Sequence, residues 1–202
     1  HHLSERKGAD FIAPVAERFK EEKVEFLVVG EGSYTPKGVT LLGKIPQSEA
    51  VKYFQASDVF FMPSREEGSP HVILEAMSSG TPFVASDVGG IREIVPKESE
   101  EFLCDVGNTN CFAQKIKKLL ENEDIYNKVQ KTNLEFVKIF SKEKAIKDFL
   151  SLFEEKIYYV ANARFPTERA HGIQMAKTIE AMMECGANVE VVVPKRGIIK
   201  NT

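Results

Sequence analysis

The alternation of helical periodicity with short apolar runs most constrains how this chain can fold. Residues 11–19 carry apolar side chains at helical spacing, and the apolar run 24–29 follows them and is closed by Gly30-Glu31-Gly32. The same order of helix and apolar run recurs up to residue 103. Strands that are apolar throughout and separated by helices are typical of parallel sheets covered on both faces. The sequence therefore predicts an α/β protein with a doubly wound, mainly parallel sheet.

The predicted elements follow from apolar spacing and from turn residues. The strands are predicted at residues 24–29, 39–42, 59–62, 83–85, 101–103, 156–160 and 189–193. Further helices are predicted at residues 50–56, 70–79 and 170–185, together with three polar stretches within 110–155 that break near Asn122 and Ser141. The helix over 70–79 is expected to have Pro70 at its first position, Ser69 as its cap, and Gly80 at its end.

Composition removes several classes of protein. A chain of 202 residues with 43% hydrophobic residues can bury a core. Lys and Arg number 27 against 30 Asp and Glu, a net charge of −3, which argues against a nucleic-acid partner. No apolar stretch approaches the roughly 18 to 20 residues of a membrane-spanning helix. The start, His1-His2-Leu3, has no Met and no apolar signal region, and we interpret it as a tag remnant joined within a longer protein.

The cysteine pattern is sparse. Cys104, Cys111 and Cys185 are odd in number and form no close-spaced pair. We therefore expect neither a zinc site nor a disulfide framework, and interpret all three as partly buried thiols in a reducing cytoplasm.

The segment 63–77 carries the richest chemistry, because it joins a predicted strand to a predicted helix. Ligands of parallel sheets gather beyond the carboxyl ends of the strands. The start of a helix offers free backbone N–H groups and a positive dipole end, which suit a diphosphate. Glu67 lies just before the helix and Glu75 more than a turn inside it, so both carboxylates are candidates to bind sugar hydroxyls. Compensation of the helix dipole is the alternative role for a glutamate here.

These residues resemble a known family. The stretch Glu67-Gly-Ser-Pro-His-Val-Ile-Leu-Glu75, followed by Gly80-Thr81-Pro82 and Gly89-Gly90-Ile91-Arg92-Glu93, is similar to the donor-binding half of glycosyltransferase family 4. The segments 3–8 and 30–32 occur in the same order relative to this motif as in the family, so the resemblance covers residues 3 to about 155. The resemblance implies the GT-B fold, in which two Rossmann-like halves face each other across a cleft. It also implies transfer of a hexose from a nucleotide-diphosphate sugar with retention of configuration, without a metal or another cofactor.

The resemblance also implies roles for individual residues. Glu75 would bind the ribose hydroxyls and Glu67 the donor sugar, while Lys7 would neutralise the departing diphosphate. Lys7 and Glu67 are therefore the candidate catalytic residues. The other candidate donor-binding residues are Gly32, Lys44, Ile45, Gly68, Ser69, His71 and Val72. The backbone N–H groups of His71 and Val72 would face the diphosphate, and the His71 side chain is expected to be exposed rather than to act as an acid or base.

The chain departs from the family at its start. Family members carry an Arg five residues before the lysine that matches Lys7. In this chain that position is His2, and no strand is expected before it. The family pattern thus predicts that a phosphate-binding cation and the first strand of the sheet are absent. Because one preorganised charge donor commonly contributes about 10² to 10³ in rate, we expect this chain to be a poor catalyst.

The tail resembles the opening strand, loop and helix of the acceptor half of the same family. We therefore predict a donor-binding domain over 3–155 and an additional C-terminal βαβ unit over 156–202 that begins an acceptor domain. A fused reading frame, the start of a second transferase and a permuted arrangement are open explanations. In a permuted chain, residues 156–160 would fill the first-strand position and Arg164 would replace the absent Arg. Gly172 is a candidate to face the phosphates, or else a turn residue.

Two classes of function remain open. The first is a retaining glycosyltransferase, or a fragment of one, with a nucleotide sugar as donor and a sugar, lipid-linked or small-molecule acceptor. The second is a non-catalytic nucleotide-sugar binding module. A GT-B epimerase or a phosphorylase is a further alternative, although no lysine for pyridoxal phosphate is identifiable. Lysines within 114–155 are candidates for contact with an anionic membrane at its cytoplasmic face, and solvated helix surface is the alternative.

Overall fold

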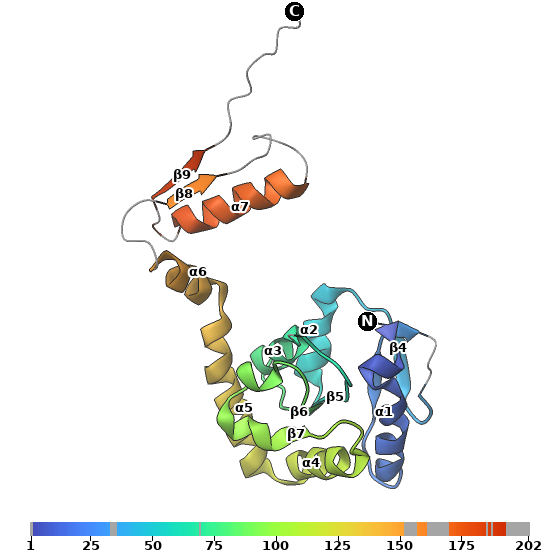
Figure 1. The fold of residues 1–202 in the computed structure, drawn as a ribbon. Coiled ribbons are helices and arrows are strands. Elements are labelled where there is room, and N and C mark those ends of the chain that lie inside the picture. The colour runs from blue at the N-terminus through green and yellow to red at the C-terminus, as the bar shows by residue number, and fades with distance from the viewer. Residues whose placement is uncertain are drawn as a thin grey trace, which may run out of the picture. The chain divides into compact units, whose positions relative to one another are not determined.

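The computed structural model describes residues 2–32, 36–68, 70–151, 157–160, 170–184, 186 and 188–192. The chain divides into two compact units, His1–Lys138 and Ile139–Thr202, and each is described by itself. The ribbon in Figure 1 runs from blue in the first unit to red in the second.

The first unit is a parallel α/β structure. Its strands are β1 (His2–Leu3), β2 (Leu27–Val29), β3 (Glu31–Gly32), β4 (Thr40–Gly43), β5 (Phe60–Met62), β6 (Phe83–Ser86) and β7 (Leu103–Cys104). Its helices are α1 (Ala9–Ala16), α2 (Gln47–Ala56), α3 (His71–Ser78), α4 (Thr109–Glu121) and α5 (Glu123–Phe136). Short 3₁₀ helices lie at Glu5–Lys7, Glu17–Phe19, Ile91–Glu93 and Lys97–Phe102, and another at Val137–Phe140 crosses the boundary between the units. The strands predicted at 24–29, 39–42, 59–62 and 83–85 are confirmed, with ends that differ by a few residues. The strand predicted at 101–103 shares only Leu103 with β7, because the 3₁₀ helix Lys97–Phe102 occupies the residues before it.

Strand pairing is parallel throughout the described chain. β1 pairs with β3, β2 pairs with β4, and β6 lies between β5 and β7. Parallel strands need a crossover between them, and helices provide several of these connections. The predicted α/β class with a mainly parallel sheet is therefore confirmed.

Strand β6 shows why the sheet is doubly wound. All four of its residues are buried, and successive side chains of a strand point to opposite faces. Phe83 and Ala85 pack in the same apolar cluster as Ile73 of α3, whereas Val84 packs in the cluster that contains Phe112 of α4. Figure 1 shows α3 on one side of β5–β7 and α4 on the other. A strand covered by helices on both faces must be apolar along its whole length, as this one is apart from its last residue.

A short first strand is present, which corrects one prediction. Leu3 pairs with Gly32 in the register of β1 and β3, and it is buried in a cluster with Ala9, Ile12 and Val28. The prediction that the first strand of the sheet is absent was therefore wrong. Apolar periodicity could not reveal this strand, because two residues are too few to form a pattern.

Helix boundaries follow the local sequence closely. The side chains of Asn122 and Ser141 accept hydrogen bonds from backbone N–H groups three residues later, which caps α5 and the helix that follows it. Both predicted breaks are thus confirmed. Helix α3 begins at His71 rather than at Pro70, which is its N-cap residue, and Ser69 lies outside the described residues. Gly80 has φ +80°, the left-handed conformation predicted at the end of this helix.

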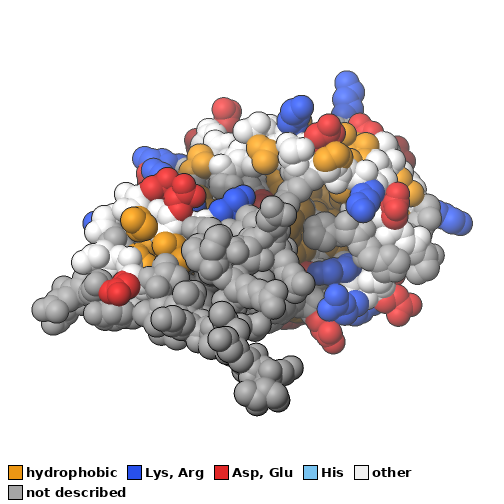
Figure 2. Space-filling model, turned by 90° about the horizontal axis from the view of Figure 1, so that it is seen from above, with side chains coloured by type: hydrophobic (Ala, Val, Ile, Leu, Met, Phe, Trp, Pro, Cys, Tyr) orange, Lys and Arg blue, Asp and Glu red, His pale blue; other side chains and the backbone are white. Residues whose placement is uncertain are grey.

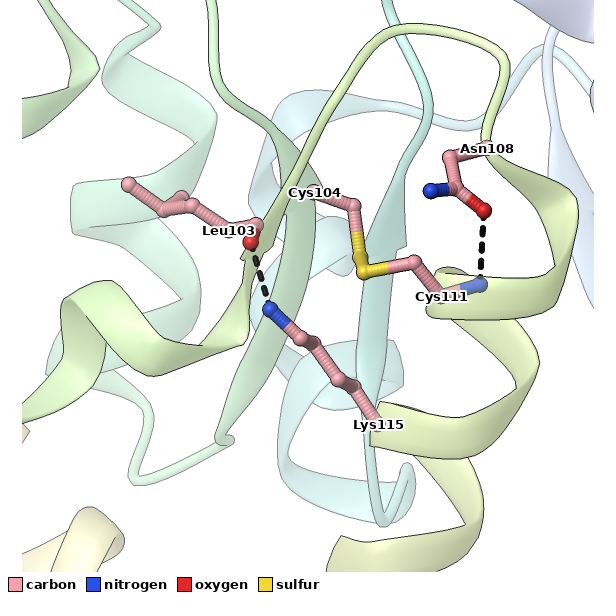
Figure 3. The surroundings of a disulfide bond; sticks show 5 residues. All are labelled: Leu103, Cys104, Asn108, Cys111 and Lys115. Atoms are coloured by element: carbon pink, nitrogen blue, oxygen red, sulfur yellow. Dashed lines mark hydrogen bonds between the residues drawn. A yellow bond between two sulfur atoms is a disulfide. The ribbon is translucent and has the colours of Figure 1, made fainter.

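A disulfide bond joins the end of β7 to the first turn of α4. Cys104, which is 2% exposed, is bonded to Cys111, and their Cα atoms are 6.0 Å apart (Figure 3). The interpretation of these two residues as unpaired thiols was wrong, because a strand, a tight turn and a helix bring their side chains together across seven residues. One helical turn beyond Cys111, Lys115 donates a 2.6 Å hydrogen bond to the Leu103 carbonyl. Burial lowers the pKa of the Lys115 ammonium below its ordinary value.

The second unit contains α6 (Lys142–Leu150), β8 (Ile157–Val160), α7 (Ala170–Glu184) and β9 (Val189–Val192). β8 pairs in parallel with β9 from Ile157 opposite Val189 to Val160 opposite Val192. This confirms the predicted strand–helix–strand unit. The boundary predicted at 155/156 falls within 152–156, outside the described residues, and the replacement of the first strand by residues 156–160 stays a prediction.

Candidate functional site

The loop that follows β5 is where three strand ends of the first unit come together. A Cβ atom added to Gly8, just after β1 and its 3₁₀ turn, would lie 1.8 Å from the Pro63 carbonyl oxygen. A Cβ atom added to Gly89, in the loop after β6, would lie 1.8 Å from the Glu67 carbonyl oxygen. Both glycines also have positive φ angles, of +65° and +54°. The loop 63–68 is therefore packed between two backbones that only glycine allows to approach so closely.

The side chain of Lys7 contacts Glu67 of this loop. The Lys7 ammonium donates a 2.7 Å hydrogen bond to Oε1 of Glu67, and the Ser64 hydroxyl donates to the same oxygen at 2.7 Å. The Lys7 and Glu67 side chains are 30% and 13% exposed, and Ser64 is buried. The two residues predicted to act in catalysis thus form a partly buried, charge-assisted contact across 60 positions of sequence.

The start of α3 follows directly. The N–H of Ile73 donates to the Pro70 carbonyl, so the His71 and Val72 N–H groups belong to the part of the helix that lacks intrahelical acceptors. His71 is exposed, as predicted. Glu75 is half-buried and four residues after His71, which places both residues on one face of the helix. A pair of N–H groups at the positive end of a helix dipole can bind a phosphate oxygen.

The remaining predicted residues lie on several elements. Gly32 pairs with Leu3 and is exposed, and Gly68 accepts a 3.3 Å hydrogen bond from the Gly90 N–H. Lys44 is exposed and Ile45 is half-buried, directly after β4. Gly32, Gly68, Lys44 and Ile45 therefore all follow, or end, strands at the same edge of parallel pairs. In the second unit Gly172 lies in the first turn of α7, whereas Ser69 and Arg164 lie outside the described residues.

Sequence reasoning missed three residues of this region: Ser64, Arg65 and Asp10. Arg65 directs both terminal nitrogens of its guanidinium at the Asp10 carboxylate, over 2.6 and 2.7 Å. The segment 63–77, singled out because it follows a predicted strand, contains Ser64 and Arg65, but no role was predicted for either. No sequence signal links Arg65 to Asp10, 55 positions earlier.

Charge is mixed over the described surface. On the face drawn in Figure 2, the Lys and Arg side chains are interspersed with Asp and Glu side chains. In the part of the chain that the structure describes, no group of three or more His, Cys, Asp or Glu residues is placed to hold a metal ion. Among the same residues, no helix combines the length and apolarity needed to cross a membrane.

The first unit has a parallel sheet with a charged loop and a helix start at its carboxyl edge. This arrangement is typical of the class of α/β proteins that bind ligands at that edge. Comparison with known proteins then gives the family. Residues 1–122 match the family model described as glycosyl transferases group 1, and the chain belongs to this family. The GT-B fold implied by the motifs is supported by the solved structures that follow.

Relatives share moderate identity with the chain. An uncharacterised glycosyltransferase of Methanocaldococcus jannaschii is 28% identical over 74% of this chain and 45% of its own length. N-acetyl-alpha-D-glucosaminyl L-malate synthase of Bacillus anthracis is 28% identical over 76% of this chain and 42% of its own length. The sulfoquinovosyl transferase of Arabidopsis thaliana is 31% identical over 58% of this chain and 25% of its own length. The chain thus spans less than half the length of these relatives.

Solved structures share the fold. TarM superposes with a TM-score of 0.63 at 25% identity, over 77% of this chain and 34% of that one. Anabaena HepE, solved with UDP and glucose, has a TM-score of 0.62 at 21% identity, over 74% of this chain and 47% of that one. The catalytic domain of the Helicobacter pylori cholesterol-alpha-glucosyltransferase has a TM-score of 0.60 at 18% identity, over 70% of this chain and 95% of that domain.

Proposed function

We propose that residues 3–155 form the donor-binding domain of a retaining glycosyltransferase. The reaction moves a hexose from a nucleotide-diphosphate sugar to a hydroxyl group of a sugar, lipid-linked or small-molecule acceptor, without a metal. The observation that carries the proposal is the contact of Lys7 with Glu67 in the loop that leads into α3. That arrangement combines a cation, a carboxylate and free backbone N–H groups, which are the groups needed by a sugar diphosphate.

The charge that develops in the reaction explains the cation. When the sugar–oxygen bond breaks, negative charge grows on the departing diphosphate, and a preorganised ammonium beside it stabilises that charge. The Lys7 ammonium has three donors, one of which is used by Glu67 in the free protein. The His71 and Val72 N–H groups at the start of α3 add donors that need no reorganisation.

The two glutamates bind different parts of the donor. Glu67 accepts hydrogen bonds from the donor sugar, and Ser64 holds one of its oxygens in place. Glu75, on the same helix face as His71, accepts from the ribose hydroxyls. Gly32, Lys44 and Ile45 lie by the nucleobase, with Gly68 and Ser69 beside the sugar and diphosphate.

A non-catalytic nucleotide-sugar binding module is the second candidate. The observation that favours it is His2 at the position where family members carry an Arg, which leaves Lys7 without the second cation of that pattern. The two candidates make the same binding prediction and differ in turnover.

Titration calorimetry with UDP, GDP and ADP, followed by donor hydrolysis and transfer assays, tests both candidates. We expect at least one nucleoside diphosphate to bind, and Glu75→Gln to weaken that binding more than the control Glu98→Gln, which changes an exposed glutamate outside the family motifs. Turnover with a bound donor supports the transferase, and binding without turnover supports the module. If no nucleoside diphosphate binds, or if Glu67→Ala and Glu75→Ala together leave binding unchanged, the proposal is wrong.

The second unit is proposed as the start of an acceptor domain over 156–202, in which Gly172 is a candidate phosphate-binding residue. We propose that the protein acts in the cytoplasm, at the inner face of the membrane when its acceptor is lipid-linked. The Cys104–Cys111 bond makes this location testable, because thiols in the cytosol are kept reduced and the bond would be absent there. Alkylation of thiols during cell lysis, followed by mass spectrometry, supports the cytoplasm if Cys104 and Cys111 are labelled and contradicts it if they are protected.

A further inference from the structure

A second ion pair joins the same two segments as Lys7 and Glu67. Arg65 lies in the loop after β5, two residues before Glu67, and Asp10 lies in the first turn of α1, three residues after Lys7. The guanidinium donates from Nη1 to Oδ1 of Asp10 over 2.6 Å and from Nη2 to Oδ2 over 2.7 Å. Two parallel hydrogen bonds fix the direction between the groups as well as their separation.

Three further contacts extend this ion pair along the turn that carries Lys7. Nη1 of Arg65 also donates to the Glu5 carbonyl oxygen, and the Arg65 backbone N–H donates to the Arg6 carbonyl over 2.9 Å. The guanidinium carbon lies 4.0 Å from the centre of the Phe11 ring. Arg65 therefore contacts the chain on both sides of Lys7, at Glu5 and Arg6 before it and at Asp10 and Phe11 after it.

Lys7 needs such support because its own side chain is flexible. A lysine side chain has four rotatable bonds, and holding its ammonium at one place costs conformational entropy. When the backbone is held on both sides of Lys7, its ammonium has fewer positions available, and part of this entropy cost is removed. The hydrogen bonds from Arg65 also hold the pKa of the Asp10 carboxyl below its ordinary value, so Asp10 is charged at neutral pH.

We propose that Arg65 and Asp10 are positioning residues, which hold the Glu5–Asp10 turn against the loop 63–68 so that the Lys7 ammonium stays beside Glu67. Their effect on a nucleotide rests on the proposed function, whereas their effect on Lys7 itself does not. The fork geometry makes a specific demand, because a lysine at position 65 keeps the charge but cannot bond Asp10 through two parallel hydrogen bonds.

The first test needs no ligand. Side-chain ammonium groups that are held in hydrogen bonds give slowly exchanging NMR signals, and the signal of Lys7 is assigned by its loss in Lys7→Gln. We expect the Lys7 signal in the full chain and its loss or broadening in Arg65→Lys and Asp10→Asn. Arg18→Lys, an exposed arginine elsewhere in the first unit, is the control that should keep it. An unchanged Lys7 signal in folded Arg65→Lys and Asp10→Asn overturns the proposal.

The second test is a double-mutant cycle with the nucleoside diphosphate that binds best, measured by calorimetry. We expect Arg65→Lys to weaken binding about fivefold or more in the otherwise unchanged protein and to have little effect when Lys7→Gln is already present. A general structural role would weaken binding equally in both backgrounds and would overturn the proposal. If no nucleotide binds while the Lys7 signal still depends on Arg65, the proposed function fails and the positioning role stands.

Discussion

Two regions of the first unit join their elements in different ways. At the carboxyl ends of β1 and β5, the joining contacts are ion pairs between side chains that are partly exposed, Lys7 with Glu67 and Arg65 with Asp10. At the end of β7, the contact is a disulfide bond to α4 that is partly buried. A phosphate can compete for an ammonium that is held by a carboxylate, but no ligand competes for a covalent bond. We call the first the exchangeable region, because Lys7 can exchange Glu67 for a phosphate, and the second the fixed region.

Removing the cation from the exchangeable region should have the largest effect. Lys7→Ala is expected to slow transfer by about 10² to 10³, because one preorganised donor to the departing diphosphate is lost. The measurement is the transfer or donor-hydrolysis rate at saturating donor. Lys23→Ala, which removes an exposed lysine in the same unit, is the control and should leave the rate unchanged. Equal rates for the two variants would remove Lys7 from the mechanism.

Opening the fixed region should lower stability rather than change binding. The disulfide closes a loop of about eight residues, and the chain-entropy estimate for such a loop is about 2 kcal/mol of the free energy of unfolding. We expect a loss of this size in Cys111→Ser, measured by chemical denaturation, with nucleotide affinity unchanged. Cys185→Ser is the matched control. A loss of affinity in Cys111→Ser would show that the two regions are coupled, contrary to the comparison.

Acid should weaken the exchangeable region before the fixed one. The pKa of Asp10 is lowered in the folded protein, so its contribution to stability is complete above the ordinary Asp value and is lost as the pH falls through the folded value. Because both partners are about one-third exposed, we expect less than about 1 kcal/mol. Denaturation curves of the unchanged protein and Asp10→Asn should therefore converge as the pH falls from about 5 to 3. Asp58→Asn, an exposed aspartate, should show no comparable convergence.

Deleting residues 156–202 should have the smallest effect on the first unit. Its apolar clusters consist of residues up to 137, and β8 takes β9 as its hydrogen-bonding partner. We expect the thermal unfolding of the first unit to stay within about 2 °C of its value in the full chain, a shift worth well under 1 kcal/mol for a unit of this size. Earlier melting would instead support the idea that residues 156–160 supply a strand to the first sheet.

The parallel α/β class, the order of the elements and several of their ends follow from the amino-acid sequence alone. Those features depend on neighbours within a few positions: the apolar run that becomes β6, the capping side chains of Asn122 and Ser141, and the glycine after α3. The motif from Glu67 to Glu75 likewise lies within one loop and one helix, so its order could be read directly.

Which side chains contact one another depends on the three-dimensional fold. Lys7 and Glu67 are 60 positions apart and Arg65 and Asp10 are 55 apart, so their contacts depend on how the ends of β1 and β5 come together. Cys104 and Cys111 are close in sequence, but whether they bond depends on the direction in which α4 leaves the turn after β7. Local spacing encodes secondary structure because those interactions are short in sequence, whereas the path of the chain in three dimensions is set by the packing of the whole core.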